Sequence, residues 1–464
     1  NLGIEPDMPI DQGFAIAVRR GDKTKIKSLD KKGFKDIRFA GEYPIALIDY
    51  SQKGFPVKVK LEAFSPFIPL DLENSILPAT VMEFAIKNTS DASVDVELTG
   101  WLENAVLTQS RKETQIIGHL VNSLKELSGN GLRLECSAVP DTSKGQGGKR
   151  PDIIFEDFEK GYKKWMISGD AFGSHIVPYY SVYHSQPLKG FKGQYLVDSF
   201  RQGDGPEGKL TSKPFTIERR YINCLVGGGK HPKQTCLNVL IDGKVVASAT
   251  GMDSETLIRN TLDVSDYMGK QAVIEIIDSH TGGWGHILVD DIVFSDVADV
   301  DMTPLPDYGT MSLALLSGDG DSSSDIKGKK EIKINSDSVL ISHLGKSLTL
   351  KPGEKKSVRY LLTWHFPTTL VLQDKPGTKT ETRYYASQFK DAAAVSDYVV
   401  SNYDKLAAAT RLWRDTLYDS TLPYWLLDRA FLNTSILASS TSIMVRDGLF
   451  YGWEGGYQGW GTCT

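Results

Sequence analysis

The feature that most constrains this chain is a change in its hydrophobic period near residue 388. Before that point, short segments such as "YPIALIDY", "FPVKVKLEAF", "TVMEFAIKNTS" and "SVDVELTGWLEN" alternate apolar with polar residues. Alternation of this kind, interrupted by Gly, Pro and Asn-Thr-Ser turns, predicts antiparallel strands with one buried face. After that point apolar residues recur about every 3.6 positions, which predicts helices. The sequence therefore predicts a mainly β protein followed by a helical region.

The strand region is itself divided in two. The segment "PDTSKGQGGKRPD" (140–152) has the composition of a linker, and residues 153–297 then carry their own strand segments, from "IIFEDFE" to "ILVDDIVFSD". The first pattern resumes at "GTMSLALLSGD" and continues to residue 367. We therefore expect a discontinuous antiparallel β-sandwich (1–148 and 299–372), interrupted by a second sandwich (149–298) and followed by a helical region (373–464).

Two helices are expected in the last region. The second of them, "PYWLLDRAFLNTSILASSTSIMVR", is predicted to be capped by Ser420-Thr421, with Pro423 in its first turn, and to end at Asp447-Gly448. Apolar residues surround most of its circumference, so other helices must cover it. We expect these helices to begin a larger all-helical domain. The apolar face of the first helix comprises Ala392, Val395, Val399, Leu406, Trp413 and Leu417.

Composition excludes several classes of function. A formal net charge of -5 provides no basic surface for nucleic acid, and no apolar run reaches the roughly 18 residues of a membrane span. None of the four cysteines lies in a CxxC motif; Cys224 and Cys236 flank a predicted hairpin and could pair, although buried thiols are the commoner outcome. The eight histidines lack metal-ligand spacing, so we expect no metal and no cofactor. The "GDGPEG" segment (203–208) is expected to be a plain turn.

The last segment, "RDGLFYGWEGGYQGWGTCT" (446–464), contains a single carboxylate, Glu454, among aromatic residues and glycines. Aromatic faces stack on sugar rings and exclude water, which strengthens the effect of a fixed charge. The same residues also fit an exposed loop carboxylate beside aromatic residues that only pack. Residue types alone leave both interpretations open.

Longer motifs carry a family resemblance. The segments "EYPIALIDY", "FPVKVKLEAFSPFIPLDLENSILPATVMEFAIKN", "GWLEN", "YLLTWHFP", "RYYASQFKDAAAVSDYV" and "WRDTLYDSTLPYWLLDRAFLNTSIL" resemble glycoside hydrolase family 116, which contains non-lysosomal glucosylceramidases and their bacterial relatives. The resemblance covers about 41–139 and 301–464. It implies an N-terminal β-sandwich joined to an (α/α)6 barrel that holds the active site, and a retaining exo-glycosidase of the β-glucosidase type.

The resemblance also implies roles for individual residues. Glu454, within "DGLFYGWEGG", matches the position of the family's catalytic nucleophile, and we expect Trp453, Tyr457 and Trp460 to contact the substrate. A retaining enzyme needs this ionised carboxylate and a protonated one about 5–5.5 Å away. The family's general acid is an aspartate farther along the chain, beyond Thr464.

No carboxylate within the 464 residues is expected to replace that general acid. Asp415, Asp428 and Asp447 lie in helix or cap contexts, where capping or solvent exposure accounts for them. We therefore expect the 464 residues on their own not to turn over substrate.

A second resemblance concerns residues 149–298. The segments "FTIERRYINCLVGGGKHPKQTCLNVLIDGKVVASATGMDSE" and "TGGWGHILVDDIVFSD" resemble a jelly-roll module attached to family 32 glycoside hydrolases, which implies carbohydrate binding. The candidate sugar-binding residues are Arg220, Asn223, His231, Trp284 and His286. Arg220 and Asn223 also fit alternate strand positions, and Trp284 also fits a core residue between turn glycines.

Two functions follow from these resemblances. The chain belongs either to a retaining exo-glycosidase that acts on oligo- or polysaccharides, or to a non-catalytic protein that binds carbohydrate through the inserted module. In both cases we expect a carbohydrate partner and an extracytoplasmic location, either periplasmic or secreted. The sequence gives no basis for an oligomeric state.

Overall fold

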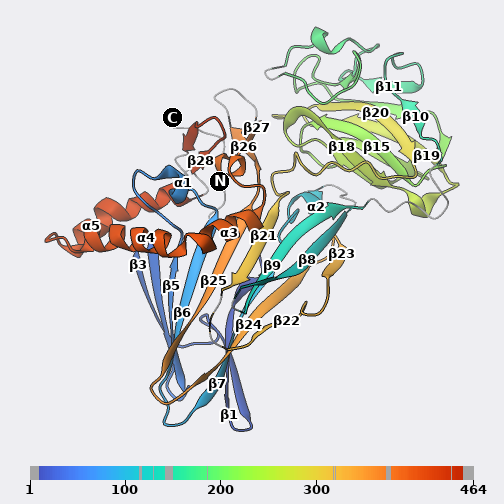
Figure 1. The fold of residues 1–464 in the computed structure, drawn as a ribbon. Helices are drawn as coiled ribbons and strands as arrows, with labels where there is room; N and C mark the ends of the chain where they lie inside the picture. The colour runs from blue at the N-terminus through green and yellow to red at the C-terminus, as the bar shows by residue number, and fades with distance from the viewer. Residues whose placement is uncertain are drawn as a thin grey trace.

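The computed structural model describes residues 10–113, 118–128, 130–141, 150–184, 187–316, 318, 320–372, 378–439 and 442–452. The described chain contains two pairs of antiparallel sheets, a group of C-terminal helices and two two-stranded hairpins (Figure 1). The predicted mainly β fold is confirmed. No helix in these ranges has the length and apolar character needed to cross a bilayer.

The first pair of sheets combines strands that precede residues 150–298 with strands that follow them. Its large sheet has nine strands in the order β23-β8-β9-β21-β25-β6-β5-β4-β3, and its small sheet has the order β2-β1-β7-β24-β22. The large-sheet strands are β3 (Asp36–Glu42), β4 (Ile45–Ser51), β5 (Val57–Phe64), β6 (Ala79–Asn88), β8 (Gly118–Leu127), β9 (Gly131–Pro140), β21 (Thr310–Leu315), β23 (Glu331–Asn335) and β25 (Lys355–His365). The small-sheet strands are β1 (Gln12–Arg20), β2 (Lys23–Ser28), β7 (Val94–Glu103), β22 (Ser322–Ser324) and β24 (Ile341–Leu350).

The core of this sandwich lies between the two sheets. Alternate residues of β6 and β7 point inward, so Phe84 and Leu98 are fully buried. Tyr360 of β25 crosses the core, and its hydroxyl lies 2.9 Å from the carbonyl oxygen of Leu98 and 3.0 Å from that of Leu344. This hydroxyl therefore joins the large sheet to the small sheet within the buried core.

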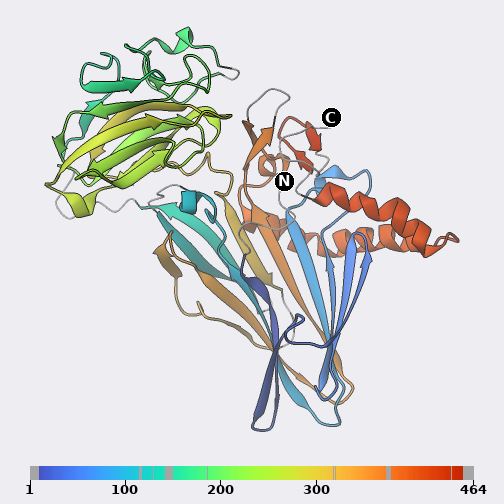
Figure 2. The same ribbon diagram turned by 180° about the vertical axis from the view of Figure 1, so that it is seen from behind.

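Helices cover the outer face of the large sheet (Figures 1 and 2). The first predicted helix forms as α3 (Ala392–Ser401) and α4 (Tyr403–Tyr418), with Asp391 capping α3 through a hydrogen bond from Ala394 N. Val395, Val399 and Leu406 are buried against strand residues such as Val81 and Leu361, as the apolar face predicts. Burial of that face holds the helices on the sheet.

The second predicted helix is shorter than the sequence indicated. It comprises α5 (Tyr424–Phe431) and a 3-10 segment, η4 (Leu432–Ala438), and the chain then forms a hairpin of β28 (Ser442–Met444) and β29 (Phe450–Gly452). The predicted helix end at Asp447-Gly448 is therefore wrong. Hydroxyl side chains account for the early end. Ser439 Oγ donates to the Ile436 carbonyl and so competes with the backbone N–H groups that would bond to such carbonyls in a helix.

The start of this helix also differs from the prediction. Pro423 is its N-cap residue rather than a first-turn residue, and no side chain caps α5. Ser420 instead accepts a hydrogen bond from Leu422 N in the preceding turn. The predicted Ser420-Thr421 cap is therefore wrong, because the observed N-cap lies at Pro423.

Residues 150–298, called the insert below, form the second pair of sheets. One has the order β10-β20-β15-β18, with β12 beside β20, and the other has the order β11-β13-β19-β16-β17, with β14 beside β19. The strands are β10 (Ile153–Glu156), β11 (Trp165–Gly169), β12 (Val197–Asp198), β13 (Gly208–Ser212), β14 (Phe215–Thr216), β15 (Tyr221–Gly228), β16 (Thr235–Ile241), β17 (Lys244–Thr250), β18 (Ser254–Asp263), β19 (Gln271–Asp278) and β20 (Ile287–Ser295). Within the described ranges these strands pair only with one another, while β9 and β21 pair across the insertion.

The insert has its own apolar core between its sheets. Ile222 and Val289 on one sheet and Leu237 and Ile276 on the other are fully buried in it. Cys136, Cys224 and Cys236 are free and buried, so the expectation of buried thiols is confirmed for these three cysteines.

Short elements complete the description. They are α1 (Leu72–Ser75), α2 (Ser110–Glu113), η1 (Tyr179–Ser181), η2 (Ser265–Tyr267), β26 (Thr368–Leu372), β27 (Thr378–Thr382) and η3 (Tyr384–Ser387).

Candidate functional site

The predicted catalytic stretch begins directly after the β28-β29 hairpin. Glu454, Trp453, Tyr457 and Trp460 lie outside the described residues, which end at Gly452 of β29. The hairpin is attached to the strand region, because Val445 forms a bridge with Arg383 and Arg446 N donates to the Thr382 carbonyl at 2.8 Å. The structure therefore fixes where the chain enters this stretch.

A cavity of about 850 Å³ lies beside that attachment point. Its walls combine aromatic side chains with a few polar groups, a composition that suits small organic ligands. Asp307 is held in the wall by hydrogen bonds from Gln109 N, Ser110 N and Ser110 Oγ. The lining residues include Ile10, Gln12, Met311, Trp364, Phe366, Arg383 and Tyr385.

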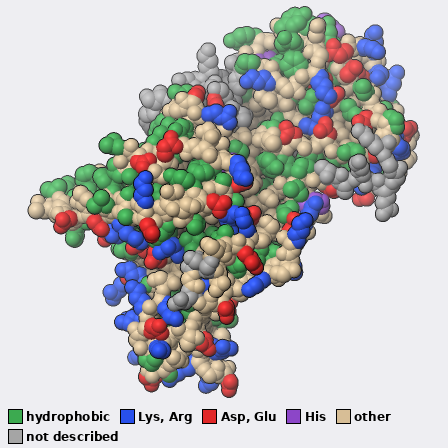
Figure 3. Space-filling model, viewed as in Figure 1, with side chains coloured by type: hydrophobic (Ala, Val, Ile, Leu, Met, Phe, Trp, Pro, Cys, Tyr) green, Lys and Arg blue, Asp and Glu red, His purple; other side chains and the backbone are tan. Residues whose placement is uncertain are grey.

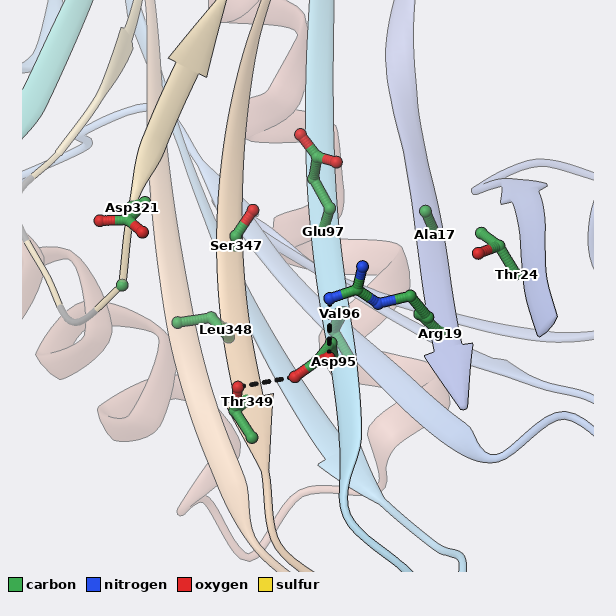
Figure 4. A pocket seen from close by; sticks show the side chains of 11 residues that line it. Ala17, Arg19, Thr24, Asp95, Val96, Glu97, Asp321, Ser347, Leu348 and Thr349 are labelled. Carbon is green, nitrogen blue, oxygen red and sulfur yellow. Dashed lines mark hydrogen bonds and ion pairs between the residues drawn. The ribbon is translucent and has the colours of Figure 1, made fainter. Parts of the chain in front are cut away.

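A second cavity, of about 450 Å³, is a polar depression on the small sheet (Figure 4). Asp95 lies at its centre, 3.0 Å from Arg19 and 2.8 Å from the hydroxyl of Thr349. The Thr349 hydroxyl and the Arg19 guanidinium lower the pKa of Asp95. Its carboxylate is therefore stabilised in the charged form, which does not suit a general acid.

The candidate sugar-binding residues of the insert lie at two opposite ends of β15. Asn223, near the start of the strand, is buried, and its amide contacts the protein's own chain: Nδ2 donates to the Val297 carbonyl, and Oδ1 accepts from Thr261 Oγ1 and Asp299 N. Arg220 precedes the same strand end, with its guanidinium 5.4 Å from the ring centroid of Tyr221. Asn223 thus holds the chain where it leaves the insert.

His231, Trp284 and His286 lie near the other end of β15, about 20 Å away at the usual rise of a strand. The rings of Trp284 and His286 stack with centroids 5.5 Å apart, and His231 stacks on His280 at 3.6 Å. Trp284 is half-buried and has a left-handed backbone conformation (φ 61°). The structure therefore groups three of the five predicted residues and separates Arg220 and Asn223 from them.

His286 belongs to a buried cluster that the sequence did not predict. His184, between η1 and β12, and Glu255 of β18 lie beside it, and the ligand atoms of the three side chains are all within 4.8 Å of one another. His184 Nδ1 is 3.0 Å from Glu255 Oε1, and His286 Nε2 is 3.4 Å from Glu255 Oε2. We call these three residues the His-Glu-His cluster.

Two further carboxylates contact the outer ring nitrogens of the cluster. Asp198 Oδ2 lies 2.8 Å from His184 Nε2, and Asp204 Oδ1 lies 2.8 Å from His286 Nδ1. Asp204 belongs to the "GDGPEG" segment that was expected to be a plain turn. These contacts fix the orientation of both imidazole rings.

Burial and charge oppose each other within the cluster. Burial alone would lower the pKa of both histidines, but the surrounding carboxylates raise the pKa of His184 and of His286 to about 9. Burial would raise the pKa of Glu255, but its contacts with the two histidines lower it to about 2. Without another cation, both histidines are therefore positively charged at neutral pH.

Sequence spacing could not reveal this cluster. His184, Glu255 and His286 come from three separate parts of the insert, and only the folding of its two sheets brings them together. The one available signal was His286 itself, which the sequence had already placed among the candidate binding residues.

Comparison with known proteins gives a family assignment. A family model described as "beta-glucosidase 2, glycosyl-hydrolase family 116 N-term" matches residues 10–158 and 309–406. A protein of Aspergillus rugulosus named "Putative glycosyl hydrolase ecdE" is 36% identical over 200 residues. The match covers 42% of this chain and 28% of that relative, so the chain spans less than a third of the relative's length.

Solved structures are similar only at a low level. The K2 cleaved adhesin domain of Lys-gingipain is 21% identical, with a TM-score of 0.23, over 31% of this chain and 97% of its own. A cyclase from Fischerella sp. TAU is 11% identical, with a TM-score of 0.20, over 32% of this chain and 100% of its own. Scores this low support no structural argument.

The family match covers more than half of the chain and is interrupted between residues 158 and 309, where the sheets of the insert lie. The match and the two-sheet architecture on either side of that interruption agree with each other. The chain belongs to glycoside hydrolase family 116.

Proposed function

We propose that the chain is the N-terminal part of a retaining exo-glycosidase of the β-glucosidase type, with Glu454 as its nucleophile. The match to the family's N-terminal domain on both sides of the insert is the observation that supports this most strongly. In the proposed reaction the Glu454 carboxylate attacks the anomeric carbon while a second carboxyl group protonates the leaving oxygen. Water then hydrolyses the glycosyl-enzyme, and the second group acts as the base.

The proposal places the rest of the active site on a helical domain that packs on α5 and η4. Large apolar side chains of these elements are exposed, with Trp425 67%, Ile436 54% and Leu437 50% accessible. Figure 3 shows hydrophobic side chains along the arm that contains α4 and α5. Apolar faces of this extent are typical of surfaces that another element covers. The length of the Aspergillus relative is consistent with a further domain.

The substrate is proposed to be an oligo- or polysaccharide with a terminal β-glucoside. The 850 Å³ cavity beside the hairpin could receive a neighbouring part of such a chain, because it combines aromatic walls with a few polar groups. Trp364 and Phe366 would contact apolar sugar faces there.

The anomeric configuration of the first product tests the mechanism. The full-length protein would be incubated with a panel of aryl glycosides, and the product would be followed by proton NMR before the anomers equilibrate. The proposal predicts hydrolysis of the aryl β-glucoside with the β anomer formed first. First formation of the α anomer would contradict double displacement, and the absence of hydrolysis across the panel would contradict the proposed activity.

Carbohydrate binding by the insert is a second candidate function, favoured by the conformation of Trp284. A left-handed conformation is strained for a bulky residue, and such strain concentrates at functional sites. The backbone is also closely packed at this point, because a Cβ atom on Gly229 would lie 1.9 Å from the Trp284 carbonyl oxygen. The indole could present one face to a sugar ring.

Calorimetric titration with oligosaccharides tests this second function. Trp284→Ala in the full-length protein is expected to weaken binding at least tenfold, while Arg220→Ala, at the opposite end of β15, should not change it. Equal affinity of the wild type and Trp284→Ala would exclude this surface as the binding site.

A further inference from the structure

We propose that His184, Glu255 and His286 form a binding site for a divalent transition-metal ion, for which zinc best matches the donor set. This inference concerns the insert alone and does not depend on Glu454 or on glycosidase activity. It rests on the orientation of the three side chains, their separations and their burial.

The outer contacts of the histidines determine which nitrogen atoms face inward. An ionised carboxylate can only accept hydrogen bonds, so His184 Nε2 donates to Asp198 and His286 Nδ1 donates to Asp204. In neutral imidazoles the lone pairs are then on His184 Nδ1 and His286 Nε2, both of which face Glu255. Histidine ligands of metals commonly donate their second nitrogen to a carboxylate in this way.

The lone pair of each inner imidazole nitrogen and the negative oxygens of Glu255 repel each other. A proton or a metal ion must therefore lie between them. A proton on each histidine is one solution, but the hydrogen bonds that it would form are poor. His184 Nδ1 is buried and lacks a hydrogen-bond partner among the described residues, although Glu255 Oε1 is only 3.0 Å away. The contact from His286 Nε2 to Glu255 is long, at 3.4 Å.

A single metal ion between the three side chains is the other solution. Bonds of about 2.0–2.1 Å in a tetrahedral zinc site separate neighbouring ligand atoms by about 3.3 Å. His184 Nδ1 lies 3.0 Å from Oε1 and His286 Nε2 lies 3.4 Å from Oε2 of the same Glu255 carboxylate, and one ligand atom from each of the three residues lies within 4.8 Å of the others. Two imidazoles and one carboxylate leave a fourth position for water or another ligand, as in many catalytic zinc sites.

The surroundings keep this arrangement rigid and dry. The side chains of His184, Glu255 and His286 are 2%, 4% and 3% exposed. Phe200 stacks on His184 with centroids 5.0 Å apart, and Trp284 stacks on His286. Imidazole ligands favour zinc or a similar transition metal over calcium or magnesium, which prefer oxygen ligands.

Metal retention by the full-length protein tests the proposal. The protein would be stripped with EDTA, incubated with zinc chloride and passed over a desalting column, and the retained zinc would be measured by mass spectrometry. We expect one zinc ion per chain in the wild type and at least tenfold weaker binding in Glu255→Gln and His286→Gln. X-ray absorption should show two imidazole ligands at about 2.0–2.1 Å.

Two further variants keep the test decisive if a buried substitution prevents folding. Asp204→Ala removes a side chain that is 30% exposed and contacts the outer nitrogen of His286, and it should weaken zinc binding 10- to 100-fold. His175→Gln changes an exposed histidine of the same module outside the cluster and should bind zinc like the wild type. The proposal is overturned if the wild type retains no zinc, if Asp204→Ala binds it with wild-type affinity, or if the bound zinc has no imidazole ligand.

Discussion

The side-chain oxygen of Asn223 accepts a hydrogen bond from the backbone N–H of Asp299, with 3.2 Å between the two atoms. The same amide donates to the Val297 carbonyl, so one buried side chain fixes the point at which the chain leaves the insert. We expect Asn223→Ala to lower the free energy of unfolding of the insert by about 2 kcal/mol, because it leaves buried polar groups without partners. Sugar binding should not change in the folded variant.

Thermal unfolding of the full-length protein checks this prediction, with Asn260→Ala as the control. The Asn260 amide bonds to the carbonyl of Ile258 within its own strand, so its loss should cost clearly less. If Asn223→Ala keeps wild-type stability and loses sugar affinity, Asn223 is a binding residue and our structural assignment is wrong.

The ion pair of Asp291 and Arg259 predicts a stability difference that depends on pH. Burial alone would raise the pKa of Asp291, but Lys192 and Arg259 hold it below its ordinary value. A lowered carboxyl pKa stabilises the folded state above the unfolded pKa of about 4, and this contribution disappears as the pH falls through the folded pKa. Asp291→Asn should therefore destabilise the insert by about 3 kcal/mol at pH 7 and by much less near pH 2.

Urea unfolding at the two pH values measures this difference. Asp242→Asn is the matched control, because Asp242 is exposed and, like Asp291, has a left-handed backbone conformation (φ 49° and 48°). The control should change stability little at either pH. A loss in Asp291→Asn that is equally large at pH 2 and pH 7 would show that the ion pair does not cause it.

The exposed apolar face of α5 and η4 gives a prediction about the full-length protein. If a helical domain packs there, hydroxyl-radical labelling of Trp425 should be several-fold slower in the full-length protein than in residues 1–464. Tyr183 of the insert, 87% exposed, should be labelled equally in both. Equal labelling of Trp425 in the two proteins would contradict the proposed packing.

Much of the fold could be predicted because its signals are local. The apolar alternation of β4 to β7 and the helical face of Val395 and Val399 each depend on neighbouring residues, and burial against a sheet reinforces both. The second helix failed because periodicity alone does not maintain a helix. Leu432, Ile436 and Leu437 are exposed, so no burial holds a helix there, and hydroxyl side chains such as Ser439 compete for backbone carbonyls.

The functional residues were harder to predict because they depend on contacts between distant segments. The sequence placed Asn223 and His286 together as binding residues. In the structure Asn223 contacts the segment that leaves the insert, and His286 contacts the buried carboxylate of Glu255. Their separation follows from the direction of β15, which the spacing of residue types does not reveal. Glu454 was identified by a family motif instead, which needs no knowledge of contacts.

The central claim is that Glu454 forms a covalent bond with the sugar during turnover. A cyclitol aziridine that mimics a β-glucoside reacts with the nucleophile of a retaining glycosidase, so peptide mapping of the full-length protein after labelling tests the claim directly. We predict a single label on the peptide that contains Glu454 and no label in the Glu454→Gln variant. A label on another residue, in a protein that hydrolyses aryl β-glucosides, would contradict the assignment of Glu454 as the nucleophile.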